Sequence, residues 1–265
     1  MIEYSIYPGE KTRIVTFSYD DGDVNDKKLV ELFDLYGMKG TFCLNSRRFL
    51  EFDDEQKMML TERYAGHEIA SHTVHHGWPI HMQPQTLVTE IVEDRKLLEK
   101  IARYPVIGAS YPFGSYNDKV EEVMRNCGIV YSRTTKSTHG FDLPLDFLAW
   151  HPTCHHRDAQ QDCERFVKQL DYKFGQPLLY IWGHSFEFTT EEEWGKMESV
   201  LDMISGLNQV WYATNLEIYN YIWAQRQLKI SMDEHIFCNP TSEDVWVVRN
   251  EVEHLLIPAG KTIEI

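Results

Sequence analysis

Two adjacent carboxylates, Asp20 and Asp21, follow the apolar segment 13–19 and precede Gly22. Because neighbouring side chains of an extended segment point to opposite faces, these two carboxylates should have different tasks. One can bind a metal ion while the other accepts a proton from a water molecule held by that ion. The alternative is a simple turn, since Asp-Gly is a common turn dipeptide, and the pair taken alone favours that alternative.

Two histidines, His72 and His76, stand four residues apart in the segment HTVHH that follows the apolar stretch 67–71. One helical turn would place both imidazoles on the same face, which is a good spacing for metal ligands. Together with Asp21 they make two histidines and one carboxylate with positions left open for water. This set suits a catalytic zinc ion, and it also suits a non-haem iron oxygenase, so the ligands alone leave both chemistries open.

Two further motifs follow predicted strands. Tyr111-Pro112-Phe113-Gly114 is a turn whose backbone N–H groups can stabilise a developing oxyanion, and His184 ends the apolar strand predicted over 177–182. A turn and a core histidine are the ordinary interpretations of these two features. However, six candidates end predicted strands at the same face, which is where the sites of α/β barrels form: Asp20, Asp21, His72, His76, Phe113 and His184.

Alternating strand and helix patterns run through most of the chain and predict a mainly parallel sheet. About seven such units favour a closed or nearly closed barrel over a three-layer sandwich. Beyond Lys229 short strand patterns without helices predict a small β-extension, so we expect a barrel domain over 1–228 and an extension packed on it over 229–265. Strands are predicted over 13–19, 40–44, 67–71, 106–111, 129–134, 147–153, 177–182 and 210–213, and helices between 25 and 37 and over 53–64, 85–103, 117–128, 160–171, 190–206 and 218–228.

The motifs TFSYDDG, HTVHH, YPFG and WGH, in this order, resemble those of the polysaccharide deacetylases, the carbohydrate esterase family four proteins with the NodB homology domain. The resemblance covers about residues 12–225. It implies a distorted (β/α)7 barrel that removes acetyl groups with a divalent metal, usually zinc. By position, it implies that Asp20 is the catalytic base and that Asp21, His72 and His76 are the metal ligands.

The resemblance also implies that the backbone N–H of Phe113 stabilises the oxyanion, that His184 is the catalytic acid, and that Trp182 lies at the acetyl pocket. Ser110 stands where the family has an arginine that orients the base. We hypothesise that Arg133, in the next predicted strand, supplies this guanidinium instead.

Two features near the acid are open. Asp142 and Asp146 are the candidates for the carboxylate that orients His184. The segment WHPTCHH, residues 150–156, has no counterpart in the family pattern. Its histidines line the substrate cleft, bind a second ion, or are ordinary loop residues, and the last interpretation is favoured.

These roles predict a hydrolase that acts on a carbon–nitrogen bond other than a peptide bond and removes acetyl groups from an N-acetylated sugar through attack of metal-bound water. The alternatives are a small-molecule amidohydrolase, an O-acetyl esterase, or a catalytically impaired glycan-binding relative. An iron oxygenase would need neither Asp20 nor His184. Tyr111, Trp150 and Trp182, with Trp78, are expected near the rim, where aromatic faces stack on sugars, unless they belong to the barrel core.

The composition excludes several partner classes. With 26 Lys and Arg against 41 Asp and Glu, the net charge of −15 argues against nucleic acid and anionic membranes, which bind cationic surfaces. No apolar run reaches the length of a membrane span, and the start of the chain has no apolar leader, which predicts a cytoplasmic protein. Five cysteines without a CxxC pattern are predicted to be buried thiols. No pattern decides the oligomeric state.

Overall fold

A strand that is buried along its whole length lies at the centre of the fold. The computed structural model describes residues 1–170 and 177–265, and in it β2 (Arg13–Asp20) pairs in parallel with β3 and β8. The start of β2 also pairs with β9. The apolar run of β2 is explained by this position, because a central strand of a parallel sheet is covered on both faces.

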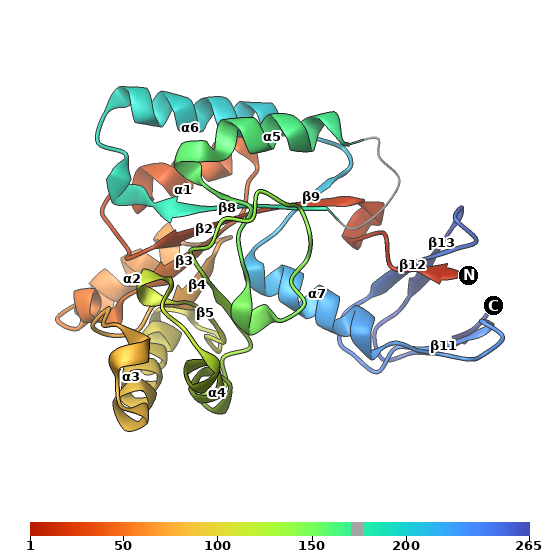
Figure 1. The fold of residues 1–265 in the computed structure, drawn as a ribbon, viewed down its shortest axis with the longest axis horizontal. Coiled ribbons are helices and arrows are strands. Elements are labelled where there is room, and N and C mark those ends of the chain that lie inside the picture. The colour runs from red at the N-terminus through yellow and green to blue at the C-terminus, as the bar shows by residue number, and fades with distance from the viewer. Residues whose placement is uncertain (171–176) are drawn as a thin grey trace.

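Within the described residues, the strands around β2 form one parallel sheet in the order β6, β5, β4, β3, β2, β8, β7 (Figure 1). All strands point their carboxyl ends to the same edge, so residues that follow them gather there. The bounds are β3 Gly40–Leu44, β4 Glu68–Ser71, β5 Gly108–Ser110, β6 Tyr131–Arg133, β7 Cys154–His155, β8 Leu178–His184 and β9 Val210–Tyr212.

The two ends of the sheet are joined by the segment 150–155. The backbone N–H of Trp150 donates to the carbonyl of Ser132 in β6, and the N–H of Thr153 donates to the carbonyl of Tyr180 in β8. The sheet therefore curls into a barrel. The strand predicted over 147–153 is wrong in its bounds: Phe147–Ala149 is a short 3-10 helix, because the Asp146 side chain accepts a hydrogen bond from the Leu148 N–H.

Seven helices cover the sheet in the described part of the chain, and sequence signals explain their ends. The predicted capping box of Thr190 and Glu193 is present. The last helix begins three residues earlier than predicted because Thr214 forms a capping box of its own. Residue 171 of the predicted helix over 160–171 lies outside the described residues. The bounds are α1 Asp26–Tyr36, α2 Asp54–Arg63, α3 Pro84–Ala102, α4 Asp118–Asn126, α5 Ala159–Lys168, α6 Glu191–Ile204 and α7 Asn215–Gln227.

The C-terminal strands lie at one end of the molecule beyond α7 (Figure 1). They form two antiparallel sheets, and one of these includes β1 (Ile2–Glu3) from the start of the chain. Ala224 of α7 packs with Phe237 and Val247 in a buried cluster of this region. None of the candidate site residues comes from it. The bounds are β10 Lys229–Ile230, β11 Ile236–Cys238, β12 Val245–Arg249, β13 Glu253–Ile257 and β14 Thr262–Glu264.

Two sequence expectations concern the environment of the chain. Across residues 1–170 and 177–265, no helix combines the length and the apolar character that crossing a membrane requires. All five cysteines are free thiols, but Cys127 and Cys238 are partly exposed, which corrects the expectation that all are buried. The cytoplasmic location stays a prediction.

Candidate metal and catalytic site

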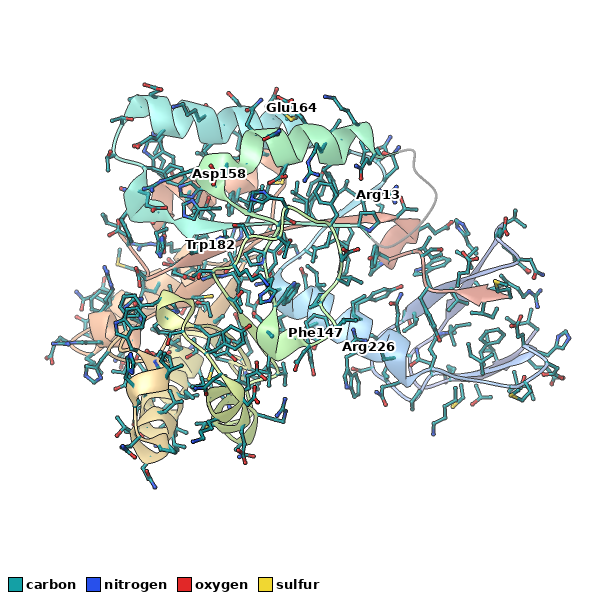
Figure 2. All side chains as sticks on the ribbon, viewed as in Figure 1. Arg13, Phe147, Asp158, Glu164, Trp182 and Arg226 are labelled. Carbon is teal, nitrogen blue, oxygen red and sulfur yellow. The ribbon has the colours of Figure 1, made fainter. Side chains whose placement is uncertain are left out.

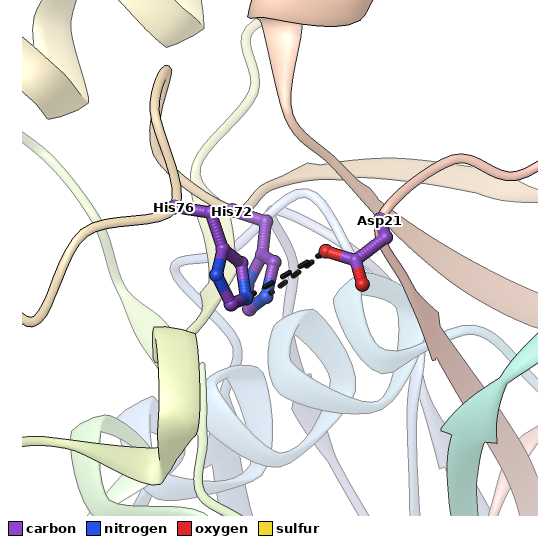
Figure 3. A group of neighbouring side chains, drawn as sticks. All are labelled: Asp21, His72 and His76. Carbon is purple, nitrogen blue, oxygen red and sulfur yellow. Dashed lines mark ion pairs between the residues drawn. The ribbon is translucent and has the colours of Figure 1, made fainter.

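Asp21, His72 and His76 meet at the carboxyl ends of β2 and β4, and Figure 3 shows both imidazoles facing the carboxylate. The Nε2 atoms of His72 and His76 lie 3.8 Å and 3.6 Å from Asp21 Oδ1. The three residues are far apart in sequence, but β2 and β4 are both neighbours of β3 in one parallel sheet. The barrel therefore places one carboxylate and two imidazoles around a common point.

The segment 72–76 is a loop, so the prediction of one helical turn is wrong. Thr73 and His76 have φ angles of 62° and 53°, in the left-handed region that L-residues seldom adopt. The Asn45 side chain donates to the carbonyls of His72 and Thr73, at 2.6 Å and 3.0 Å. Glu90 accepts from the His75 N–H at 2.8 Å. These buried polar side chains hold the loop, and sequence spacing alone did not indicate them.

The three donors fit a divalent metal ion. His72 Nε2 is buried and has no hydrogen-bond partner among the described residues, which is costly unless a ligand occupies it. On the other side of the ring, Nδ1 lies 3.0 Å from the Ser110 carbonyl oxygen. Such a contact orients a metal-binding imidazole and leaves its Nε2 lone pair free. Burial lowers the pKa of His72, although Asp20 and Asp21 oppose the shift, and this favours the neutral, metal-binding form.

Asp20 is 2% exposed and is held by two side chains. Ser110 Oγ donates to Asp20 Oδ1 at 3.0 Å, and Arg133 Nη2 donates to Asp20 Oδ2. Burial alone would raise the pKa of Asp20, but the Arg133 guanidinium and His72 outweigh it and hold that pKa well below its usual range. Ser110 Oγ also lies 2.7 Å from His72 Nδ1, so the residue at the position of the family arginine links Asp20 to a metal ligand.

His184 is opposite Asp20 in the register of β2 and β8. Its Nδ1 lies 3.6 Å from Glu187 Oε2. Burial lowers the pKa of His184, but contact with Glu187 and the charge of Asp20 more than offset this and raise it overall. Glu187 therefore occupies the place for which Asp142 and Asp146 were the candidates. The spacing of three residues from His184 is the signal that could have found it.

Phe113 follows β5 and lies beside the metal ligands. Its φ angle is 59°, and its ring centroid is 4.5 Å from that of His76. Trp78 stacks on the same ring with centroids 4.2 Å apart and planes at 6°. Asp21, with φ of 77°, shares the left-handed backbone. Strained conformations of this kind cluster where a fold must aim specific groups.

The aromatic residues expected at the rim do not all reach it. Trp150 is fully buried against Tyr131 and Tyr180, so it offers no ring face to a sugar, and the prediction is wrong for this residue. Tyr111 is also buried and donates its hydroxyl to the Leu148 carbonyl. Both belong to buried clusters: Trp150 packs with Phe147, and Tyr111 with Ile91. Trp182, labelled in Figure 2, is 8% exposed and packs against the Arg133 guanidinium.

Residues 8–132 match the sequence profile of the family described as Polysaccharide deacetylase. The match covers just under half of the chain, and this part of the chain is similar in sequence to polysaccharide deacetylases. The chain is 26% identical over 118 residues to a peptidoglycan-N-acetylglucosamine deacetylase of Bacillus cereus. The aligned residues make up 44% of this chain and 54% of that relative. It is 29% identical over 112 residues to an Arthroderma benhamiae protein assigned the same activity. That alignment covers 42% of this chain and 26% of the relative. The chain thus spans about half or less of these curated relatives.

Solved structures confirm the polysaccharide deacetylase fold. A protein from Mycobacterium smegmatis assigned as a polysaccharide deacetylase aligns with a TM-score of 0.63 at 16% identity over 83% of this chain and 93% of its own. The peptidoglycan deacetylase PdaC of Bacillus subtilis aligns with a TM-score of 0.55 at 15% identity over 84% and 96%. A pseudoenzyme from Bacillus anthracis aligns with a TM-score of 0.54 at 15% identity, over 80% of this chain and 66% of its own. The predicted distorted (β/α)7 barrel is therefore confirmed, while activity must be argued from the site.

The barrel also buries a carboxyl group beside Ser185, the residue that follows His184. Asp26, 1% exposed, accepts hydrogen bonds from Ser185 Oγ at 2.5 Å and Tyr64 Oη at 2.7 Å. Burial raises its pKa from 3.8 to about 7, although the two hydrogen bonds oppose the shift. The folded chain therefore binds a proton that the unfolded chain releases between these pH values. The contribution of Asp26 to stability is full below pH 3.8 and is lost as the pH rises through about 7.

We expect Asp26→Asn to gain stability relative to the wild type as the pH rises, because the amide cannot ionise. Thermal unfolding followed by circular dichroism from pH 5 to pH 8 measures this. The melting temperature of the variant minus that of the wild type should increase across the range. Asp142→Asn, in an exposed loop, serves as the control. A difference independent of pH would contradict the ionisation of Asp26.

Proposed function

We propose that this chain is a metal-dependent hydrolase that removes acetyl groups from an N-acetylated sugar or glycan. One observation carries the proposal: a buried carboxylate paired with an arginine, a set of three metal donors and a histidine–glutamate pair surround one end of the barrel. The names of its relatives support the same bond type, since a relative from Bacillus cereus is called a peptidoglycan-N-acetylglucosamine deacetylase.

Asp21, His72 and His76 would hold the metal ion. Two imidazoles and one carboxylate with open positions are typical of catalytic zinc, so we propose zinc. When bound, such an ion polarises a carbonyl group and increases the acidity of water. The buried position of His72 and the contact of its Nδ1 with Ser110 keep the donor nitrogen aimed at the site.

Asp20 would accept the proton of the attacking water. The contacts with Arg133 and Ser110 keep this carboxylate ionised and fix its two oxygens, so its orientation is set before the substrate binds. The Phe113 N–H would donate to the developing oxyanion, and the left-handed backbone at this residue supports that role.

His184 would protonate the leaving nitrogen. An amine leaves only after it gains a proton, so this step matters for an amide. Glu187 Oε2 lies beside His184 Nδ1, and the raised pKa of His184 favours the protonated form that the step needs.

The experiment that tests this function is acetate release from N-acetylglucosamine oligomers by metal-stripped protein, with and without added zinc. We expect zinc to restore release and His76→Ala to prevent the restoration. A parallel assay on an acetate ester tests the esterase alternative. No acetate from the oligomers in zinc-loaded, folded protein would contradict a deacetylase, and a preference for the ester would favour the O-acetyl esterase.

We expect His184→Gln to separate amide from ester substrates. Loss of a general acid should lower kcat on an N-acetyl substrate by about 10²–10³-fold. An acetate ester of an acidic alcohol, whose leaving group needs little protonation, should lose less than about 10-fold. Steady-state kinetics on both substrates measures the two ratios. Equal losses on both substrates would argue that His184 only supports the structure.

We expect Trp78→Ala to weaken binding of a glycan rather than the chemical step. Trp78 and Phe113 are 48% and 47% exposed and stack as a pair beside the metal ligands, so they present an aromatic face to solvent. Loss of one stacking partner corresponds to about 1 kcal/mol, or roughly a 5-fold increase in KM for an oligosaccharide with kcat little changed. Trp223→Ala, on α7 and 46% exposed, is the matched control. An unchanged KM would exclude Trp78 from the binding surface.

A further inference from the structure

Three imidazoles surround one carboxylate oxygen of Glu187. His155 Nε2 lies 3.0 Å from Glu187 Oε2, and His156 Nε2 lies 3.3 Å from the same atom. His184 Nδ1 is 3.6 Å away. The cluster shares none of the residues Asp21, His72 and His76. It uses the histidines of the segment 150–156 that the family pattern does not explain.

The imidazoles of this cluster approach Glu187 Oε2 without the alignment of a hydrogen bond. Glu187 Oε2 is buried and has no hydrogen-bond partner among the described residues, and the same is true of His156 Nδ1 and His184 Nδ1. A buried carboxylate oxygen without a partner is costly. Donor atoms around a tetrahedral ion with bonds of about 2.0–2.1 Å lie roughly 3.3 Å apart. The separation of His156 from Glu187 matches this spacing, and that of His155 is 0.3 Å shorter.

The cluster is rigidly built. A Cβ atom at Gly183 would lie 2.0 Å from His156 Nδ1, so only glycine lets this imidazole pack against β8. The His156 ring also stacks on Phe188 at 4.5 Å, and the His155 ring meets Trp182 edge to face at 4.8 Å. Packing of this kind holds ligands in place before a metal arrives.

The cluster is accessible and can take a cation. A cavity of about 240 Å³ reaches His156 and Glu187. Arg157 Nη2 lies 2.9 Å from Glu187 Oε1, which occupies the other carboxylate oxygen and leaves Oε2 for the ion. Arg157 is itself 64% exposed, so water screens its charge. Glu193 and Lys196 also line this cavity, and its volume leaves room for water to complete the coordination.

We propose that His155, His156 and Glu187 bind a second divalent transition-metal ion, separate from the ion at Asp21, His72 and His76. Imidazole nitrogens with one carboxylate select zinc, cobalt or nickel over magnesium and calcium, which prefer sets of oxygen ligands. Occupancy would also share Glu187 between the ion and His184. The inference does not depend on the proposed deacetylation, since it concerns metal binding alone.

The test counts zinc on the full chain. The double variant Asp21→Asn/His76→Ala removes the first site. After gel filtration in excess zinc, elemental analysis should give two zinc ions per chain for the wild type and one for this double variant. Adding His155→Ala and Glu187→Gln should lower the count to zero and weaken zinc binding at least 100-fold in a calorimetric titration. Adding His235→Ala instead, an exposed histidine near the C-terminus, should leave one ion bound.

Two results would overturn the proposal: a double variant that binds no zinc, or one zinc ion that stays after loss of His155 and Glu187. Circular dichroism verifies that each variant is folded. If the quadruple variant does not fold, cobalt provides a measurement on the unmodified chain. The first equivalent of zinc fills one site, and cobalt added afterwards should give the intense visible absorption of a four-coordinate ion. A spectrum identical to that of free cobalt would contradict the second site, whatever the result of the acetate assay.

Discussion

Asp20→Asn is expected to lower acetate release by about 10³-fold while zinc stays bound. The magnitude is that of a lost general base, and an amide cannot accept the proton of the attacking water. Zinc should remain because its proposed ligands are Asp21, His72 and His76 rather than Asp20. Release of acetate measured alongside the zinc content distinguishes the two roles of these adjacent carboxylates.

Asp21→Asn is the matched control for this experiment, because it exchanges the same atoms one residue later. That variant should lose its activity and the zinc ion of the site formed by Asp21, His72 and His76. If Asp20→Asn keeps activity within 10-fold of the wild type, or if it loses zinc as Asp21→Asn does, the assignment of the base to Asp20 is wrong. Thermal unfolding must accompany both assays, since Asp20 is the buried partner of Arg133.

Arg133→Met is expected to destabilise the fold by about 3–5 kcal/mol and to lower activity strongly. Arg133 is fully buried and Asp20 nearly so, and removal of one member of a buried ion pair leaves the other charge without compensation. The guanidinium also donates to the Thr134 carbonyl and covers the Trp182 ring, so packing is lost as well. Urea unfolding of the variant measures the loss of stability.

A double-mutant cycle isolates the pair. The loss of unfolding free energy in the double variant Asp20→Asn/Arg133→Met should be at least about 1 kcal/mol smaller than the sum of the two single losses. The reason is that the second substitution removes a buried charge whose partner the first substitution has already removed. Arg48→Met, an arginine with a half-exposed side chain, should change the free energy of unfolding by less than about 0.5 kcal/mol. Strictly additive losses for Asp20 and Arg133 would show that the two do not stabilise one another.

The sequence alone predicted most helices and strands and most of the residues that form the site. The strand pattern over 13–19, which is rich in β-branched and aromatic residues, the capping signals and the alternation of strand and helix are local patterns. Local hydrogen bonding and burial decide them. The same is true of the candidates that follow strands. Parallel strands bring their carboxyl ends to one edge whatever the loops do, so the sequence predicts that Asp20, Asp21 and His184 share a face.

Local patterns failed where distant side chains hold a loop or compete for space. The helical turn over 72–76 is replaced by a left-handed loop because Asn45 and Glu90, from other elements, supply the backbone partners that a helix would have supplied itself. Trp150 and Tyr111 are in the core rather than at the rim, because exposure depends on which loops cover a strand end.

Only the tertiary structure decided which charges meet. Arg133 was the hypothesis for the partner of Asp20, and the contact forms because the pairing of β5 with β6 brings Arg133 beside Ser110 in register. Glu187 reaches His184, His155 and His156 because a short helix after β8 turns it back under the segment 150–156. The sequence determines which residue types are present and in which order they follow the strands. Contacts between groups more than a turn apart depend on sheet register and on loop closure, which no local signal contains.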